Sequence, residues 1–148
     1  MSLQPVIGFH FSVEIEISPQ DDLDLRFQEV SGLSQELATE DLTEGGENRF
    51  SHALPTRSTY QNLVLKRGFV KSTALIEWAK RSIENIDIVP ANVLIKLLNE
   101  NTHEPVASWY VINAYPVKWS FSNFNAQDDS IVVETMEFKY QYYTSLLN

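Results

Sequence analysis

Few side chains in this sequence are of the types that perform acid–base, metal or nucleophilic chemistry. The three histidines, His10, His52 and His103, fall in a predicted strand, a long loop and a predicted hairpin turn. None has the HxxxH or HExxH spacing that places two imidazoles on one helix face to share a metal ion. His10 alternates with apolar neighbours, which places it on the solvated face of its strand. With no cysteine in the chain, there is neither a thiolate metal site nor a disulfide framework.

Two short motifs match catalytic or phosphate-binding sequences only in part. Ser31-Gly32 lacks the preceding glycine and the strand-to-helix context of a nucleophile elbow. Gly45-Gly46 lacks the lysine and the Ser/Thr that hold phosphate and magnesium in a phosphate-binding loop. We interpret Ser31-Gly32 as a bulge or tight bend, and Gly45-Gly46 as part of a loop.

The carboxylates also fail to form a site. Asp21, Asp22 and Asp24, and the pair 128–129, lie in oxygen-rich turns without the ligand spacing and terminal glutamate of a calcium loop. Candidate acid–base pairs would need a pocket that raises one pKa. The candidate pairs are Glu14 with Glu16 and Glu134 with Glu137. They lie on alternating strands, and we interpret their carboxylates as charges that face outward. The sequence therefore predicts no catalytic, cofactor-binding or metal-binding residue, and a protein that is not an enzyme.

Aromatic residues gather in the second half of the chain: Trp109, Tyr110, Trp119, Tyr140, Tyr142 and Tyr143. They could form a stacking platform for a sugar or a base. Packing in a core or a subunit interface is the favoured interpretation, because aromatic side chains dominate both.

The net charge of −9 and the isoelectric point of about 4.7 argue against a nucleic-acid-binding surface, because phosphate binding needs clustered lysine and arginine. The eleven basic residues are scattered along the chain. The acidic balance fits either a solvated surface or a wall that repels a passing polyanion. No apolar run approaches the ~20 residues needed to span a bilayer. The N-terminal residues lack a basic region and a long apolar core, so they are not expected to be a signal peptide.

One helix is predicted, at about residues 73–85. Its apolar stripe comprises Leu75, Ile76, Trp78, Ala79 and Ile83. Thr73, or Ser72, is expected to cap the first turn, and Glu77 to pair with Arg81 one turn later. A strand at 63–65 precedes the helix, and 66–68 is interpreted as the turn that closes this strand.

The rest of the chain alternates with the period of β-strands. Residues 9–17 and 23–27 are expected to form a hairpin, and a weaker strand follows at 33–42. Strands are also predicted at 93–98, covered on one face by the helix, at 106–114 and 117–121 on either side of a bend, and as one closing strand at 131–143. About seven or eight antiparallel strands with one flanking helix predict a β-barrel or sandwich, in a single domain spanning 1–148.

The longest irregular segment is 43–60, punctuated by Gly45-Gly46 and Pro55. Excursions of this length inside a compact domain are uncommon and tend to be functional. The segment is predicted to be either a protruding arm, such as a hairpin that touches a neighbouring subunit, or a flexible loop.

Several segments, taken in order, carry a resemblance to a known family. They are 27–33 (FQEVSGL), 54–57 (LPTR), 62–68 (NLVLKRG), 97–101 (LLNEN), 113–119 (NAYPVKW) and 133–138 (VETMEF), with Trp78, Pro105-Val106 and Trp109. From about residue 9 to 142 the chain resembles the tail tube proteins of contractile phage tails and contractile injection systems. The acidic tract 36–47 departs from the family pattern, so the resemblance leaves open a main tube protein or a specialised ring near the baseplate.

The resemblance implies a barrel of two packed sheets, with Gly32 and Gly68 at bends and Trp78, Trp109 and Trp119 packed inside. It implies six copies in a ring through strand pairing, and rings stacked into a hollow tube inside a contractile sheath. The arm at 43–60 would contact the adjacent ring. The residues before 9 and after 142 would lie at ring contacts. Sheath, baseplate or tube-initiator proteins are the implied partners, and DNA or protein the cargo. Assembly is expected in a bacterial cytoplasm, within a phage tail or an extracellular particle.

Two alternatives remain open on the sequence. The chain can be a tube initiator or baseplate-linked tube protein of the same machine. It can also be a monomeric β-barrel that binds a carbohydrate through its aromatic residues, which requires a concave pocket.

Overall fold

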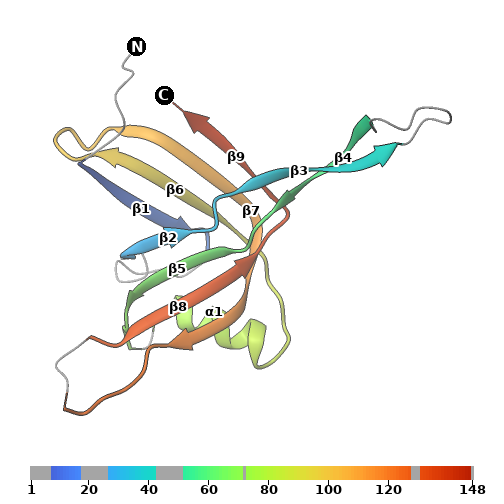
Figure 1. The fold of residues 1–148 in the computed structure, drawn as a ribbon. Coiled ribbons are helices and arrows are strands. Elements are labelled where there is room, and N and C mark those ends of the chain that lie inside the picture. Colours follow the sequence, from blue (N-terminus) through green and yellow to red (C-terminus); the bar gives the residue numbers. More distant parts are fainter. Residues whose placement is uncertain (1–7, 18–26, 43–51, 72, 128–130, 148) are drawn as a thin grey trace.

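The computed structural model describes residues 8–17, 27–42, 52–71, 73–127 and 131–147, and these form a β-structure with one helix (Figure 1). The fold class predicted from the sequence is confirmed. The strands are β1 (Phe9–Ile15), β2 (Glu29–Ser31), β3 (Gln35–Leu42), β4 (His52–Tyr60), β5 (Leu63–Gly68), β6 (Ala91–Asn99), β7 (Pro105–Phe121), β8 (Val133–Lys139) and β9 (Tyr142–Leu147), and the helix is α1 (Ala74–Ile83).

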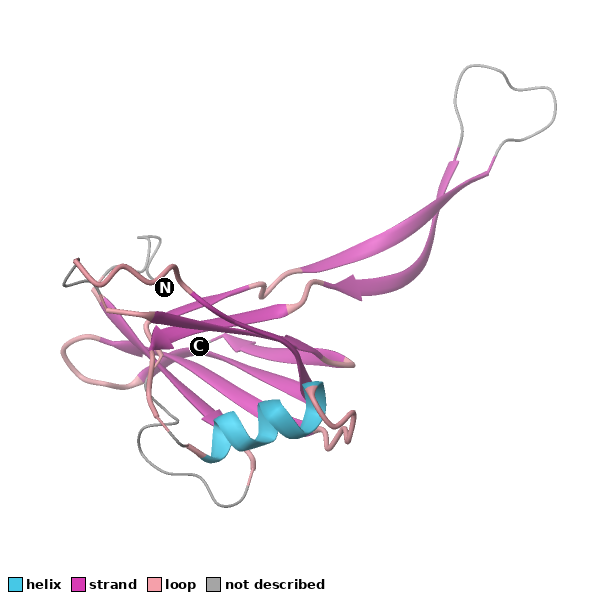
Figure 2. Ribbon diagram, turned by 90° about the horizontal axis from the view of Figure 1, so that it is seen from below, coloured by secondary structure: helices cyan, strands magenta, loops and turns pink. Residues whose placement is uncertain are grey.

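Seven strands form one antiparallel sheet that bends around β7. The first part of β7 pairs with β6 on one side and β9 on the other, and β6 pairs with β1. The last part of β7 pairs with β8, which continues through β5 to β2. We call the group β1-β6-β7-β9 sheet A and the group β2-β5-β8-β7 sheet B. Strands β3 and β4 pair only with each other among the described strands and project from the body as a hairpin (Figure 2).

The core lies between the two sheets and under the helix. Its fully buried members alternate along their strands, as expected for strands with one dry face; they include Val13, Ile15, Leu63, Leu65, Val93, Val111, Met136 and Phe138. The helix adds Leu75, Trp78 and Ala79 to this core. Trp78, predicted as the anchor, stacks on Phe138 and donates its indole N–H to the Val89 carbonyl at 2.7 Å.

The predicted helix is confirmed, with differences in detail. Thr73 caps it by accepting a hydrogen bond from the Ile76 N–H. The predicted Glu77–Arg81 pair is replaced by an ion pair between Arg81 and Asp87 in the following loop. Ile83 is exposed, and the buried stripe instead ends at Ser82, whose hydroxyl donates to the Pro116 carbonyl. No helix in the described part of the chain is long and apolar enough to cross a membrane.

Several predicted strand boundaries are wrong. Residues 66–68, predicted as a turn, continue β5, because Arg67 finds a buried carboxylate partner on β8. The two strands predicted at 106–114 and 117–121 are one strand, whose predicted bend survives as a register shift between Pro116 and Lys118. The single strand predicted at 131–143 is two, because the chain crosses from sheet B to sheet A at residues 140–141.

Two predictions about neighbours also change. The helix packs mainly against β7 rather than over β6. The described partner of β1 is β6, and most of the predicted hairpin partner at 23–27 lies outside the described residues.

Candidate assembly surfaces

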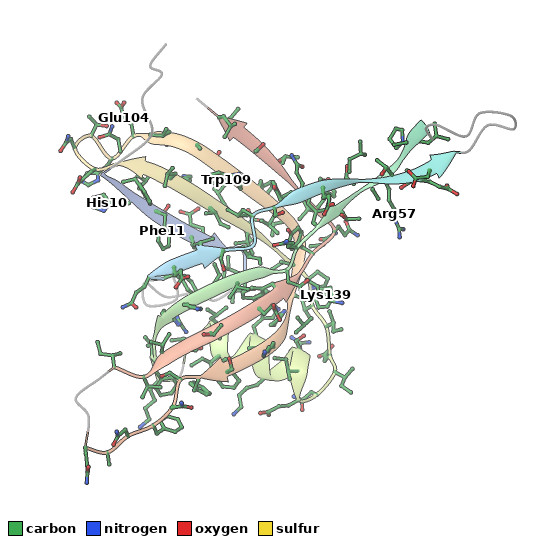
Figure 3. The ribbon with its side chains drawn as sticks, in the orientation of Figure 1. His10, Phe11, Arg57, Glu104, Trp109 and Lys139 are labelled. Carbon is green, nitrogen blue, oxygen red and sulfur yellow. The ribbon has the colours of Figure 1, made fainter. Side chains whose placement is uncertain are left out.

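The side chains first considered for chemistry do not form a reaction centre in the described part of the chain. The rings of His10 and His103 stack with centroids 5.3 Å apart on the exposed rim where β1 begins and the β6–β7 turn lies (Figure 3). His52 begins β4 on the projecting hairpin. No group of three or more His, Asp or Glu in the described ranges could hold a metal ion. The aspartates at 21, 22, 24, 128 and 129 and the glycines at 45 and 46 lie outside those ranges.

Ser31-Gly32 is a bend, as predicted. Gly32 has φ +90°, and a Cβ at this position would lie 1.9 Å from the Asn62 carbonyl oxygen. Only glycine fits this approach. The contact holds the chain leaving β2 against the start of β5, at the base of the hairpin.

Glu134 was predicted as an outward charge, and the structure corrects this. Glu134 and Arg67 are each 1% exposed. The Arg67 Nε lies 3.3 Å from one carboxylate oxygen of Glu134, and the Trp119 indole N–H donates to the other at 3.0 Å. Arg67 also donates to the Thr73 hydroxyl at 3.3 Å. The sequence signal was present, because Glu134 occupies an inward position in the series of Met136 and Phe138. The network ties sheet B to the beginning of α1, and its charges are paired within the core.

The Glu14–Glu16 pair behaves differently. Glu14 is exposed, and Glu16 accepts a hydrogen bond from the Tyr110 hydroxyl at 2.9 Å. The same hydroxyl accepts from the Asn92 amide at 3.0 Å. Glu16, the residue after β1, is thus connected with Asn92 of β6 and Tyr110 of β7 on the outer side of sheet A.

That outer side is one of two surfaces of the described structure that face away from the core. Its residues alternate with the buried core positions and remain partly or fully exposed; they include Ser12, Glu14, Glu16, Leu94, Lys96, Ser108, Tyr110, Ile112, Thr144 and Leu146. Two carboxylates and one ammonium group are therefore set among polar and aliphatic side chains. Among the described residues of this face, the only lysine or arginine is Lys96.

Sheet A also ends in two strands that have a partner on one side only. In the described residues β1 pairs with β6 alone, and β9 pairs with β7 alone. Since each neighbouring pair in sheet A is antiparallel, β1 and β9 run antiparallel to each other. The outward N–H and C=O groups of such edges are templates for pairing with another chain.

The second free surface is the β3–β4 hairpin, which we call the arm (Figure 2). Residues 52–60, predicted as irregular, form β4, so the protruding-hairpin form of the prediction is correct for the described part of 43–60. A register shift between Leu37 and Thr39 twists the pair. The side chains of Leu37 and Leu54 are 56% and 44% exposed. The arm is thus held by strand pairing and packs little of its own apolar surface.

Three tyrosines join the base of the arm to the body. Tyr60, the last residue of β4, contacts the edge of Tyr143 with ring centroids 5.2 Å apart and of Tyr140 at 5.9 Å. The Tyr140 hydroxyl donates to the Gln61 carbonyl at 2.6 Å. Burial, with smaller contributions from Tyr143 and Tyr60, raises the pKa of Tyr140 to about 12. Burial also raises the pKa of Tyr143, followed by the effect of Tyr60.

The other aromatic residues of the predicted platform contact different partners in the described structure. Trp109 borders a cavity of about 330 Å³, whose other walls are mostly aliphatic or phenyl groups and whose polar members are Gln28 and Glu29. Trp119 is engaged with Glu134, and Tyr110 with Glu16. Tyr142 is exposed on β9.

Comparison with known proteins agrees with this geometry. Residues 8–144 match the family model described as T4-like virus tail tube protein gp19, and the chain belongs to this tail tube protein family. The family is one of structural proteins, and a structural tube subunit fits the fold described above. A search of curated sequences found no match.

Solved structures extend the comparison. A chain of the anti-feeding prophage baseplate, determined with 6-fold symmetry, is 30% identical, with a TM-score of 0.86 over 99% of this chain and 97% of that one. A chain of the sheath–tube complex of an extracellular contractile injection system is 25% identical, with a TM-score of 0.78 over 97% and 93%. Hcp1 from Flavobacterium johnsoniae shares the fold at 17% identity, with a TM-score of 0.57 over 93% and 98%.

Proposed function

We propose that this chain is a subunit of the inner tube of a contractile particle, in which six copies close into a ring and rings stack into a hollow conduit. On this proposal the chain acts as a single domain, and its role is structural rather than catalytic. The observation that carries the proposal is the pair of open, mutually antiparallel edges of sheet A.

Closure of a ring satisfies both edges at once. If β9 of one subunit lies beside β1 of the next, the strand directions continue the antiparallel alternation of sheet A across the boundary. This contact is head-to-tail, and head-to-tail contacts form closed rings when their rotation divides a full turn. Six four-stranded sheets then make one continuous wall. The 6-fold symmetry of the anti-feeding prophage baseplate supports the number six.

The outer side of sheet A would line the lumen of such a ring. Each subunit would contribute Glu14, Glu16 and Lys96, with Tyr110 held by hydrogen bonds to Glu16 and Asn92. A weakly acidic lining without clustered lysine or arginine lets a polyanion or a polypeptide pass without strong binding. DNA and protein are both compatible cargoes.

The arm would make the contact between rings. Its two exposed leucines, Leu37 and Leu54, would be covered by contact with a second molecule. Sheath and baseplate proteins would be the further partners, because the relatives come from a sheath–tube complex and a baseplate. The particle would be assembled in a bacterial cytoplasm and belong to a phage tail or a tail-like injection machine.

A second candidate is a tube initiator or baseplate-linked ring of the same machine. The observation that favours it is the 30% identity to a chain of the anti-feeding prophage baseplate, against 25% for the chain of the sheath–tube complex. Such a protein would form one ring and stack only on a different tube protein.

Negative-stain microscopy of the purified protein, with its mass from light scattering, tests the proposal. Rings with a central hole and a mass near six times 17.0 kDa are expected. Tubes would favour the main tube protein and isolated rings the initiator. A strict monomer at high concentration would contradict ring formation by this chain alone.

A further inference from the structure

Two histidines form a ring contact at one end of sheet A. His10 is the second residue of β1, on the outer side of the sheet, and it pairs with Leu98 of β6. His103 lies in the turn between β6 and β7. The two imidazole rings stack with centroids 5.3 Å apart and an angle of 30° between their planes, and both residues are exposed. Figure 3 shows His10 and Glu104 at this end of the sheet. The contact therefore joins the start of β1 to the β6–β7 turn within reach of solvent.

The turn fixes where the ring of His103 can lie. Its φ is +57°, in the left-handed region that is uncommon for residues other than glycine. The His103 N–H donates to the Asn99 carbonyl at 2.8 Å, and the Asn99 side chain accepts from two further N–H groups of the turn. The Glu100 N–H donates to the Gly8 carbonyl at 3.0 Å, which ties the turn to the residue before β1. The stack is thus set by a hydrogen-bonded turn on one side and by a paired strand on the other.

Charged groups of both signs surround the pair. In the described part of the chain, those around the start of β1 are Glu100 and Glu104 of the turn, Lys96 on the outer side of β6, Glu14 further along β1, and Glu29 of β2, which pairs with Lys66. The carboxylates of the turn partly offset one added proton. A second proton places two cations in one stack, on the face that already holds the Lys96 ammonium, and like charges repel.

The charge of such a pair depends on pH in the physiological range. Histidine is the side chain whose charge ordinarily changes between pH 5 and 8. Neutral imidazoles pack ring on ring, as aromatic pairs do at this spacing. Two imidazolium ions in the same positions repel each other. The stabilisation from the neutral stack is therefore present above this pH range and is lost as the pH falls through it.

The pair also lies beside an edge of the proposed ring. Phe9 pairs with Asn99 of β6, and Leu147 pairs with Ala107 of β7, so β1 begins and β9 ends at the same end of sheet A. When β9 of one subunit lies beside β1 of the next, the last residues of β9 approach the first residues of its neighbour's β1. Strand pairing across that boundary needs the start of β1 to stay in register with β6.

We propose that the His10–His103 stack is a pH-sensitive latch, which holds the start of β1 in place when neutral and releases it when protonated. Acidification then weakens the contact between neighbouring subunits of a ring. The proposal rests on the proposed ring and adds a regulation to it. Each subunit brings one latch, so small local effects add up around the ring.

Light scattering over a dilution series, at about pH 7.5 and about pH 5.5, tests the latch. Both values lie above the isoelectric point of about 4.7, so the protein keeps a negative net charge. The protein concentration at which half of the subunits are in rings should rise about tenfold at the lower pH, because several repulsive pairs act in one ring.

Two failures are distinguishable. If rings form equally well or better at the lower pH, the latch is wrong and the proposed function stands. If no rings form at either pH, the proposed function is contradicted and the latch falls with it.

Two variants separate the stack from its charge. His10→Phe keeps an aromatic ring against His103 but leaves a single titratable group, so rings should form as in the parent at the higher pH and weaken by less than about threefold at the lower. His103→Asn suits the left-handed backbone and removes the stack, so rings should be weaker at the higher pH and show little further loss. The full pH dependence of the parent in either variant would overturn the proposal.

The matched control is His52→Gln, which removes the third histidine of the chain, at the start of β4 on the arm. This variant should keep the full pH dependence of the parent. Loss of the dependence in His52→Gln would overturn the proposal, because a different imidazole would then be the sensor.

Hydrogen exchange supplies a second readout at the latch itself. After correction for the intrinsic rate at each pH, the amides of β1 should exchange faster at the lower pH relative to those of β7. His10→Phe should abolish this difference. An equal change in β1 and β7 would overturn the proposal, because the effect of acid would then not be local to the latch.

Discussion

The body and the arm are built from the same kind of strand and are stabilised in opposite ways. The body buries Val13, Leu65, Phe138 and their neighbours between two sheets and a helix. The arm has cross-strand hydrogen bonds and leaves Leu37 and Leu54 exposed. A two-stranded hairpin without a packed face is marginal in water. The comparison indicates that the body is stabilised by its own core. The arm is stabilised by its attachment at the base and by any molecule that packs against it.

The largest effect on the body is expected from Trp78→Ala. This change opens a cavity beside Phe138 and removes the indole donor from the Val89 carbonyl. The free energy of unfolding should fall by about 3–5 kcal/mol, measured by urea denaturation. The control Ile88→Ala removes an exposed side chain and should change it by less than about 0.5 kcal/mol. A Trp78 variant as stable as its parent would show that the helix is not part of the core.

The next effect concerns the buried ion pair. Glu134→Ala leaves the Arg67 guanidinium without its carboxylate in the core and the Trp119 N–H without an acceptor. A loss of about 3 kcal/mol is expected, because an uncompensated buried charge is costly. Glu137→Ala, on the opposite face of β8, should cost well under about 1 kcal/mol by the same measurement. Equal losses would mean that the pair is not desolvated.

A smaller effect is expected at the junction of body and arm. Tyr140→Phe removes the hydrogen bond to the Gln61 carbonyl but keeps the ring against Tyr60 and Tyr143. The expected loss is about 1 kcal/mol. The variant should also increase hydrogen exchange of the amides in β3 and β4 relative to those in β6. If hydrogen exchange in β3 and β4 did not change, the tyrosine cluster would not be what positions the arm.

The same tyrosine gives a pH signature. The folded-state pKa of Tyr140, about 12, lies above the ordinary 10.0, so folding favours the neutral phenol. Stability from this group is complete below pH 10 and is lost as the pH rises from 10 toward 12. Phenolate absorbance should show a late-titrating tyrosine that is missing in Tyr140→Phe, and a titration identical in both proteins would contradict the assignment.

The smallest effect on the body, and the largest on assembly, is expected from deletion of residues 45–56. Because the arm adds little to the core, the unfolding free energy should change by less than about 1 kcal/mol. Microscopy should show rings without tubes. If the deletion destabilised the body by several kcal/mol, the arm would be part of the folded core after all. If intact tubes still formed, the arm would not be needed for ring stacking.

The sequence predicted the parts of the fold that rest on local pattern. The alternation in β1 and β6, the apolar stripe of α1 and the Thr73 cap depend on residues a few positions apart. Each was found, although Ser82 rather than Ile83 ends the buried stripe. The bend at Gly32 was also predicted, although the reason for glycine, the close approach of the Asn62 carbonyl, involves a distant segment. Local periodicity is visible in a sequence because its period is a property of the element itself.

Long-range partners decided the rest. Lys66-Arg67-Gly68 has the composition of a turn, and only the carboxylate of Glu134 on another strand makes Arg67 a buried strand residue. Residues 131–143 alternate without interruption, yet the chain changes sheets at 140–141 because β8 and β9 pair with different parts of β7. The acidic composition likewise could not be assigned to a surface before the register placed two carboxylates and one lysine on the outer side of sheet A.

The sequence by itself thus determined a β-rich chain with one helix and a resemblance to tail tube proteins. Tertiary structure alone decided that sheet A ends in two antiparallel edges, open among the described residues, that the arm is a paired hairpin, and that the rings of Phe69 and Phe121 meet beyond the end of β5. The physical reason is that edges, arms and patches are defined by which groups remain unpaired after folding. That property depends on every contact made elsewhere in the chain.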